Sequence, residues 1–488
     1  MQNCRIIREN KEKMDNKTIN ISQEQIEQQY AFMRLVKERN NVFYAENGRL
    51  PRVHVLTFGC QQNEADSEYL AGMSVEMGYE KTENAEDADL IVVNTCAVRE
   101  HAELRALSIT GQFKHLKKAN KNLKIGICGC MVTQEHRKDD IKNKYPYVDF
   151  LFGTNMLWKF PEILNESFDR KKRLFYFDHE SSNIWEGLPV KRESDFKAWI
   201  SVMYGCNNFC SYCVVPYVRG RERSRQPSEI ISQIKDLAKK GYKEFTLLGQ
   251  NVNSYGKDLN TDYDFSDLLT DICKIEGDFW VRFMTSHPKD ASKKLIDTMA
   301  REEKIVKHLH LPFQAGNDRV LKVMNRKYDS KGYFELVSYA KEKIHNVGLT
   351  SDVIVGFPTE TDEEFEDTLE MLRKVEFDSV YSFIYSPRKD TPAAAMEGQI
   401  PDEVKKKRFT KLLEVQNGIT KDLNSEYVGK TIKILVEGKS KSDTDKYTGR
   451  NEKNRIVHID GDDSVIGKFV HVRIDKADTF AMYGTVIN

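Results

Sequence analysis

Short apolar runs alternate with helical patterns between residues 52 and 130. The runs 53–60, 90–96 and 125–130 are apolar enough to form buried strands, whereas residues 67–77 and 100–116 repeat apolar side chains at helical spacing. Strands that alternate with helices predict a parallel, doubly wound sheet. Such sheets build their sites beyond the carboxyl ends of the strands. The pattern therefore predicts an N-terminal doubly wound domain with a site at one end of its sheet.

A second alternating region begins with the apolar run 198–204. Helical patterns, such as residues 227–240 with a stop at Gly241, separate it from five further runs at 244–248, 280–284, 307–311, 350–355 and 379–385. Six β/α units predict a partial (β/α)6 barrel, in which the carboxyl ends of the strands face the active site.

Beyond Tyr427 the helical patterns stop. Short runs at 431–436, 455–459, 469–474 and 485–487, divided by Gly and Asp, predict a small antiparallel β-barrel. The predicted fold class is therefore α/β, with a doubly wound parallel-sheet domain, a partial barrel and a small C-terminal β-barrel.

Two segments lie outside these patterns. Residues 1–50 form an N-terminal extension, in which 22–40 can be one amphipathic helix. This helix either docks on the next domain or is an unattached lead-in. Residues 150–195 are rich in Lys, Glu and Asn and are interpreted as a connector.

The composition says more about the cellular compartment of the protein than about its function. Lys+Arg and Asp+Glu are equal at 75 each, so net charge neither favours nor excludes nucleic acid. No apolar run approaches the roughly 18 residues of a membrane span, and residues 1–17 lack a signal-peptide core. Nine cysteines in such a long chain are typical of reduced thiols. We expect a cytoplasmic protein without membrane contact.

The strongest chemical motif is Cys206-x3-Cys210-x2-Cys213, directly after the apolar run 198–204. Three thiolates at this spacing can hold three corners of a cubane iron–sulfur cluster and leave one iron open for a small molecule. A zinc knuckle is the alternative, but it needs four Cys or His ligands and no histidine lies nearby.

The three N-terminal apolar runs also end in cysteines, namely Cys60, Cys96 and Cys130. A lone strand-end cysteine is usually a small buried hydrophobe, but three of them in one domain predict a second cluster site. Cys128 competes with Cys130, because both have the same strand parity and the pleat does not separate them.

Polar residues follow the predicted barrel strands. They include Gln250, Ser286, Gln314 and Gly356, each of which is either a ligand contact or ordinary loop chemistry. His287 is interpreted as a structural histidine or a base. The segment Arg219-Gly-Arg-Glu-Arg-Ser-Arg225 is either an anion site or a solvated loop.

The spacing around Cys206 resembles the radical S-adenosylmethionine (SAM) superfamily. Longer motifs make the whole layout similar to the methylthiotransferases and their MiaB branch. These motifs are Thr57-Phe-Gly-Cys-Gln-Gln-Asn-Glu64, Asn94-Thr-Cys-Ala-Val-Arg-Glu100, Thr285-Ser-His-Pro288, Leu309-His-Leu-Pro-Phe-Gln314, Ser351-Asp-Val-Ile-Val-Gly-Phe-Pro358 and Gly449-Arg-Asn-Glu-Lys-Asn-Arg455. The resemblance implies an N-terminal methylthiotransferase domain at 51–168, a radical SAM core at 192–422 and a TRAM domain at 425–488.

The resemblance also implies the chemistry. Two [4Fe-4S] clusters are expected, an auxiliary one on Cys60, Cys96 and Cys130 and a radical-generating one on Cys206, Cys210 and Cys213. SAM is expected to serve as methyl donor and radical source, bound near Tyr212, Gln250, Ser286, Asp352 and Gly356. No catalytic residue beyond the cluster ligands is expected.

The implied reaction is methylthiolation of N6-isopentenyladenosine at C2, at tRNA position 37 beside the anticodon. The TRAM domain is expected to bind tRNA, and its basic residues Lys439, Lys441, Lys446, Arg450, Lys453 and Arg455 are interpreted as one loop. An electron donor such as flavodoxin or ferredoxin and a monomeric enzyme are also expected. The alternatives are a branch acting on threonylcarbamoyladenosine or on a ribosomal protein, and a non-catalytic iron–sulfur protein that binds RNA.

Overall fold

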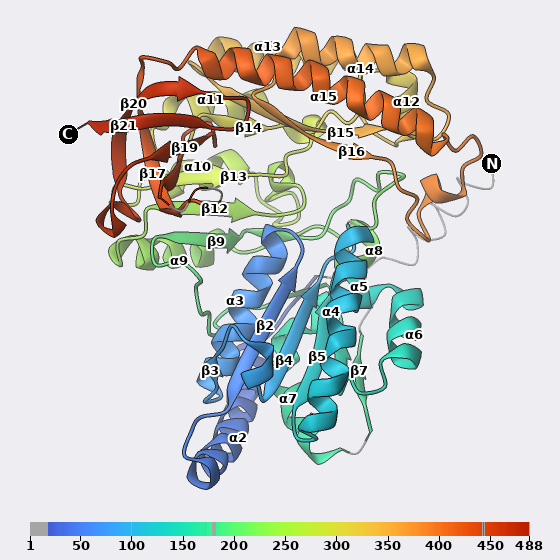
Figure 1. Cartoon of the computed structure of the whole chain (residues 1–488), viewed down its shortest axis with the longest axis vertical. Helices are drawn as coiled ribbons and strands as arrows, with labels where there is room; N and C mark the ends of the chain where they lie inside the picture. The colour runs from blue at the N-terminus through green and yellow to red at the C-terminus, as the bar shows by residue number, and fades with distance from the viewer. Residues whose placement is uncertain are drawn as a thin grey trace. The chain divides into compact units, whose positions relative to one another are not determined.

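The structure is a computed structural model that describes residues 18–98, 100–170, 172–177, 182–441, 443 and 445–487. These residues divide into two compact units (Figure 1). Unit 1 contains the chain up to Glu193 together with 203–207 and 213–225, and unit 2 contains the rest. Among the described residues, no helix is both long and apolar enough to cross a bilayer.

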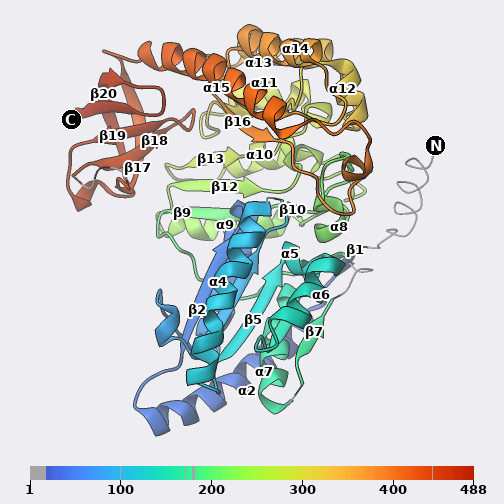
Figure 2. The same cartoon turned by 45° about the vertical axis from the view of Figure 1, so that its right-hand side comes forward.

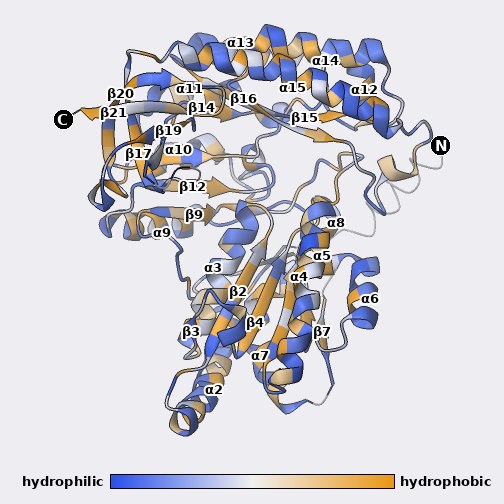
Figure 3. Cartoon of the chain, viewed as in Figure 1, coloured by the Kyte–Doolittle hydropathy of each residue, from blue (hydrophilic) through white to orange (hydrophobic). Residues whose placement is uncertain are grey.

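Unit 1 is built on a six-stranded sheet, and every neighbouring pair in it is parallel. Its strands in spatial order are β3 (Glu80–Lys81), β2 (Arg52–Phe58), β4 (Leu90–Thr95), β5 (Lys124–Gly129), β6 (Phe150–Phe152) and β7 (Leu174–Tyr176). The central strands β4 and β5 are mostly apolar (Figure 3). The prediction of a doubly wound parallel sheet is confirmed.

Helices cover both faces of this sheet (Figures 1 and 2). The core on one face takes side chains from α2 (Gln23–Asn47), α3 (Gln61–Glu76) and α7 (Phe160–Asp169). The core on the other face takes them from α4 (Glu100–Ala119), α5 (Cys130–Thr133) and α6 (Glu135–Lys144). The remaining elements of unit 1 are β1 (Thr18–Asn20), β8 (Ser182–Ile184), β10 (Met203–Tyr204), β11 (Arg223–Ser224), α8 (Val215–Arg219) and the 3-10 turns η1 (Ala85–Asp87) and η2 (Thr154–Lys159).

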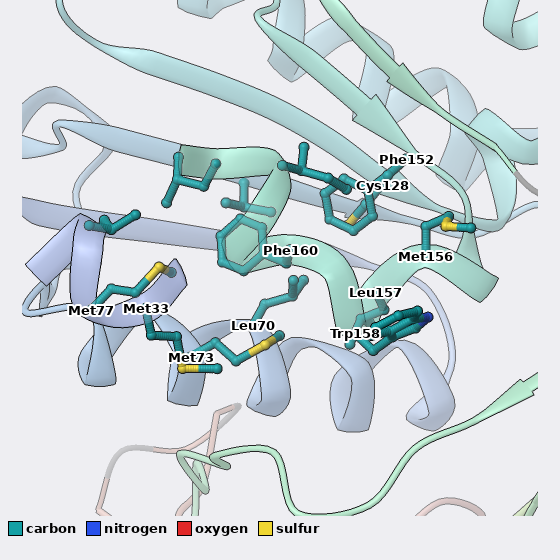
Figure 4. Packing of buried hydrophobic residues seen from close by; sticks show 14 of the residues in the cluster. Met33, Leu70, Met73, Met77, Cys128, Phe152, Met156, Leu157, Trp158 and Phe160 are labelled. Carbon is teal, nitrogen blue, oxygen red and sulfur yellow. The ribbon is translucent and has the colours of Figure 1, made fainter. Parts of the chain in front are cut away.

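Two segments of unit 1 answer questions that the sequence left open or answered wrongly. Helix α2 docks on the sheet, because Met33 and Val36 are buried in the same core as Leu70 and Phe160 (Figure 4). Ser22 caps its first turn with a reciprocal capping box, so the helix starts where the sequence predicted it. The interpretation of 150–195 as a connector is wrong, since β6, α7 and β7 complete the sheet and its core. Residues 1–17 of the predicted extension lie outside the described residues.

Unit 2 contains six parallel barrel strands, in two groups that are ordered β9-β12-β13 and β14-β15-β16. A parallel bridge between Val281 and Ile305 links the groups. The strands are β9 (Lys197–Ser201), β12 (Glu244–Leu248), β13 (Trp280–Phe283), β14 (His308–His310), β15 (Gly348–Val355) and β16 (Ser379–Ile384). All six predicted strands are present, so the prediction of a partial (β/α)6 barrel is confirmed.

The barrel helices are α9 (Pro227–Lys239), α10 (Phe265–Cys273), α11 (Lys293–Arg301), α12 (Asp318–Val323), α13 (Ser330–Lys343) and α14 (Asp362–Val375). The long helix α15 (Asp402–Ser425) follows them. Short 3-10 turns lie at η3 (Val252–Ser254), η4 (Pro288–Asp290), η5 (Pro392–Ala395) and η6 (Asp463–Val465).

The C-terminal part of unit 2 is a closed five-stranded barrel. Its strands are β17 (Thr431–Lys439), β18 (Tyr447–Asn451), β19 (Ile456–Ile459), β20 (Phe469–Ala477) and β21 (Met482–Ile487). The small barrel was predicted, but its strand β18 was not, and β19 pairs with β21 in parallel. The barrel is therefore antiparallel except at that one pair.

Candidate metal centres and cofactor site

Three cysteines of unit 1 share one end of the sheet. Cys60 caps α3 after β2, Cys96 follows β4, and Cys130 begins α5 after β5. Because β2, β4 and β5 are adjacent parallel strands, the three residues follow neighbouring carboxyl ends. This is the end of the sheet at which the sequence predicted a site.

The three thiols also interact electrostatically. A hydrogen bond with the Cys96 thiol and the positive charge of Arg219 lower the pKa of Cys60 to about 6. The same thiol contact raises the pKa of Cys96, and burial raises that of Cys130. The backbone N–H of Val98 donates to the Cys96 sulfur at 3.3 Å. The three cysteines thus form one interacting group that can supply thiolates to a metal centre.

A buried amide network fixes the strand ends below these cysteines. The Asn63 side chain donates to Asn94 Oδ1 at 3.2 Å and to the Thr95 carbonyl at 3.3 Å. Asn94 returns a bond to the Asn63 carbonyl at 2.9 Å and another to Ser67 Oγ at 3.0 Å. Because a buried amide without partners is costly, this arrangement holds the end of β4 and the start of α3 in one geometry.

Gly129 separates Cys128 from Cys130. Its φ of 97° lies in the left-handed region, and a Cβ there would collide with the Thr95 carbonyl. The strand pleat ends at this residue, so equal parity no longer implies the same direction. Cys128 is buried in the core with Phe152 (Figure 4), whereas Cys130 packs in a separate cluster with Ala97, Val214 and Val218. The structure therefore separates the two cysteines that the sequence left as alternatives.

The second triad lies in the loop 206–213, which contributes to both units. Cys206 and Cys213 belong to unit 1 and Cys210 to unit 2. In unit 2, Asn325 Nδ2 donates to the Phe209 carbonyl at 2.7 Å, and Arg326 Nη1 donates to the Cys210 sulfur at 3.3 Å. Phe209 itself has a φ of 48°, a strained value that such contacts maintain.

The chemistry of both triads fits iron–sulfur clusters. Each triad includes a sulfur that accepts a hydrogen bond from a buried arginine, which is a contact that stabilises thiolates. Among the described residues, no three His, Cys, Asp or Glu side chains are placed to bind one metal ion. A cluster binds its cysteines through separate irons, so its ligands do not need to surround a single ion.

The predicted SAM contacts all lie in unit 2. Gln250 follows β12, Ser286 follows β13, Asp352 lies on β15, and Gly356 follows β15. The Tyr212 ring packs edge-on against Phe357, with centroids 6.4 Å apart. Gln250, Ser286 and Gly356 therefore follow the carboxyl-terminal ends of barrel strands, whereas Asp352 lies within β15 and Tyr212 in the cysteine loop.

Buried polar atoms at these strand ends fit a polar ligand. Three polar atoms, Ser286 Oγ and Asn253 Oδ1 and Nδ2, are buried and have no hydrogen-bond partner among the described residues. Thr285 and Gln314 have φ values of 64° and 67°, which are unusual for non-glycine residues and concentrate at functional sites. Sequence reasoning missed Asn253, because no local pattern marks it.

Asp352 and Gly356 already have partners in the chain. The Asp352 carboxylate lies 3.7 Å from His310 Nε2, and the Gly356 N–H donates to Glu360 Oε2 at 2.9 Å. Gly356 has a φ of 73°, and a Cβ at this position would collide with Lys405. This glycine therefore has a packing role whether or not it contacts a ligand.

His287 is held as a neutral structural group. Its Nδ1 accepts the Lys289 N–H at 3.2 Å as the cap of η4, and burial lowers its pKa to about 2. This placement agrees with the structural interpretation of His287.

The arginine segment 219–225 is neither an open anion site nor a solvated loop. Arg219, Arg223 and Arg225 are buried, and all three donate to groups of unit 1. Arg225, for example, forms a two-bond contact with the Glu186 carboxylate at 2.6 Å.

The predicted basic loop of the C-terminal barrel is not one loop. Arg450 lies on β18 and pairs with Glu437 at 3.3 Å, and Lys446 pairs with Asp460 at 2.7 Å. Lys439 pairs with Asp463 at 3.7 Å, while Lys453 and Arg455 pair with Asp378. Lys441 alone of the six makes no ion pair with a described residue, and it is exposed. The charge argument for RNA is therefore weaker than the sequence indicated.

Three family models match the chain in the order of its folded parts. Residues 52–153 match the uncharacterized protein family UPF0004, residues 200–372 the radical SAM superfamily, and residues 425–487 the TRAM domain. Among solved structures, a radical SAM methyltransferase, TsrM from Kitasatospora setae, is similar with a TM-score of 0.52 at 12% identity, over 70% of this chain and 75% of that one. This likeness concerns the fold alone. Fold and matches together define a radical SAM protein with a TRAM domain.

Curated relatives give a narrower class. A tRNA-2-methylthio-N(6)-dimethylallyladenosine synthase of Acetivibrio thermocellus is 48% identical over 97% of this chain and 98% of its own length. The enzyme of the same name from Alkaliphilus oremlandii is 50% identical over 90% of this chain and 93% of its own. The chain belongs to the family of tRNA-2-methylthio-N(6)-dimethylallyladenosine synthases.

Proposed function

We propose that the protein is a radical SAM tRNA methylthiotransferase that converts N6-(dimethylallyl)adenosine at tRNA position 37 into its 2-methylthio derivative. The observation that carries this function is the 48% identity with a synthase of that reaction over nearly the whole of both chains. The cofactors are SAM and [4Fe-4S] clusters, and the substrate is a tRNA.

The assignment of ligands is part of the proposal. Cys60, Cys96 and Cys130 would hold the auxiliary cluster, and Cys206, Cys210 and Cys213 the radical-generating one. The common end of β2, β4 and β5 and the hydrogen bonds to Cys130 and Cys210 support this assignment. When bound, the clusters supply the electron that cleaves SAM and the site that carries sulfur.

The residues of the chain position these groups. Ser286 and Asn253 supply buried donors and acceptors for SAM, and Tyr212 supplies an aromatic face beside Phe357. Arg326 donates to the Cys210 sulfur and also to the Pro312 carbonyl at 2.9 Å, which ties the cysteine loop to the segment that follows β14. Gln250 and Gly356, which follow β12 and β15, and Asp352 within β15 remain proposed SAM contacts.

The reaction needs a radical, because the C2–H bond of an adenine is neither acidic nor electrophilic. A target base must also leave its stack, and this is easiest in a single-stranded loop such as the anticodon loop. The proposed domains are 51–168, 192–422 and 425–488. An electron donor such as flavodoxin or ferredoxin, a monomeric state and a cytoplasmic location complete the proposal.

One reconstitution experiment tests this function. The full-length protein, reconstituted anaerobically with iron and sulfide, is incubated with SAM, a reductant and tRNA that carries N6-(dimethylallyl)adenosine. We expect 5′-deoxyadenosine, methionine and the 2-methylthio nucleoside in the digest. Absence of SAM cleavage in a protein with full iron content would reject the radical SAM function.

A further inference from the structure

Arg219 contacts the cysteine site of unit 1 directly. Only 5% of the residue is exposed. Its Nε donates to the Cys130 sulfur at 3.2 Å, and its Nη2 donates to Asp66 Oδ2 at 2.8 Å. Because the guanidinium is a rigid planar fork, these two bonds fix both its position and its direction.

Neighbouring contacts hold this arginine in place. Asp66 also accepts a bond from Gln62 at 3.1 Å, so the carboxylate that orients Arg219 is itself fixed on α3. On the other side, the Arg219 carbonyl accepts Arg223 Nη1 at 2.8 Å, and the Val218 carbonyl accepts Thr154 Oγ1 at 2.7 Å. Both neighbours hold α8 while its last residue points at Cys130.

A buried cation at a cluster sulfur has a definite electrostatic effect. Reduction adds negative charge to a cluster, and hydrogen bonds to its sulfurs and the local net charge set its potential. A guanidinium that donates to a ligand sulfur in a buried site stabilises the reduced form more than the oxidised form. Asp66 offsets part of this charge, but the N–H···S bond remains.

We propose that Arg219 is a positioning residue that holds the Cys130 sulfur and raises the reduction potential of the cluster on Cys60, Cys96 and Cys130. This role rests on the proposed function, since it requires that cluster. It also explains why an arginine-rich segment follows the cysteine loop without serving as an anion site.

The test measures the potential of this cluster in the full-length chain. In a parent variant with Cys206, Cys210 and Cys213 changed to Ala, only the auxiliary triad remains. Arg219→Gln removes the charge and the fork, and Arg219→Lys keeps the charge but loses the fork. Arg225→Gln is the matched control, because it removes another buried arginine of the same segment that bonds to Glu186 instead.

Redox titration followed by electron paramagnetic resonance gives the midpoint of each variant. We expect a shift to more negative potential in Arg219→Gln, a smaller shift in Arg219→Lys and none in Arg225→Gln. If Arg219→Gln assembles no cluster, the result supports the positioning of Cys130, and Arg219→Lys then decides the effect on potential.

Two different results distinguish a failure of the Arg219 role from a failure of the proposed function. A normal cluster with an unchanged or more positive midpoint in the Arg219 variants overturns the role of Arg219 and leaves the proposed function intact. A parent that assembles no cluster contradicts the proposed auxiliary site and, with it, this role.

Discussion

The pair Cys128→Ala and Cys130→Ala gives a sharp test of the auxiliary site. Each substitution removes one sulfur atom, and the two positions are only two residues apart. Cys128 is 1% exposed and packs in the apolar core (Figure 4). Cys130 instead accepts a hydrogen bond from Arg219. The structure therefore predicts two different outcomes for one chemical change.

The expected costs differ in kind. Cys128→Ala leaves a cavity the size of one sulfur atom, which corresponds to about 1 kcal/mol by analogy with other single-group core deletions. The Cys128 carbonyl keeps its bond from Thr95 Oγ1 at 2.6 Å, so the strand end stays in place. Cys130→Ala removes one of the three proposed ligands, and it leaves Arg219 without its sulfur acceptor.

Iron content and spectra of the reconstituted variants measure the difference. Cys128→Ala should keep the iron of both clusters, while Cys130→Ala should lose about half of it. Thermal melts of the iron-free chains should show a small destabilisation in Cys128→Ala. Loss of iron in Cys128→Ala with full iron in Cys130→Ala would refute the assignment of Cys130.

Three further predictions concern other parts of the chain. Changing Cys206, Cys210 and Cys213 together to Ala should remove about half of the iron and all 5′-deoxyadenosine formation, as measured by iron assay and chromatography; full iron would contradict separate clusters. Lys441→Gln should weaken tRNA binding and make the slope of log K against log salt concentration about one smaller in magnitude. The control Lys446→Gln, whose side chain is already paired with Asp460, should change both quantities less, and equal effects of the two variants would argue against a phosphate contact at Lys441. Burial raises the pKa of Glu360 to about 7, so the folded state binds its proton more tightly and should lose stability as pH rises from about 4.5 to 7. Glu360→Gln should flatten that part of the stability curve in thermal melts, and an unchanged curve would show that another group titrates there.

The sequence predicted most of the fold because its apolar runs and helical repeats coincide with the strands and helices of the structure. The run 244–248 is β12 to the residue, and Gly241 follows the end of α9, as the sequence indicated. Strand β6 was missed because its three apolar residues are too short a run to mark a strand. The polar strand β18 was missed because its pairing depends on neighbouring strands and not on local hydrophobicity. Tertiary partners decide such elements.

The candidate site was predictable as a set of cysteines but not as a geometry. Parity could not separate Cys128 from Cys130, because the φ of Gly129 that breaks the pleat has no local sequence signal. The sequence also did not show that most of the arginines and lysines in the two basic segments are paired with acidic side chains. Arg219 and Arg455 find their acidic partners, Asp66 and Asp378, at distant positions in the chain. Such pairs become visible only in the folded structure.

Buried contacts of the C-terminal barrel affect how its role in tRNA binding is best tested. Arg282 of β13 donates to the carbonyls of Asn451 and Glu452 at 2.8 and 3.1 Å, and to Glu244 on β12. Deleting residues beyond 425 would remove the two carbonyls from Arg282 and would leave Asp378 without Arg455. Breaking a buried ion pair costs about 3–5 kcal/mol. Surface substitutions such as Lys441→Gln therefore test tRNA binding more cleanly than a truncation.

The most direct test of the proposed function compares two tRNAs that differ only at position 37. One carries N6-(dimethylallyl)adenosine and the other unmodified adenosine, and both are incubated with the reconstituted enzyme, SAM and reductant. A site that positions the base through its apolar N6 group should react poorly with plain adenosine, since a displacement of about 1 Å can lower the rate roughly a hundredfold. Mass spectrometry of the digested nucleosides should show the 2-methylthio product only in the first tRNA. Equal turnover of both tRNAs, or a methylthio group found only on a ribosomal protein, would contradict the proposed function.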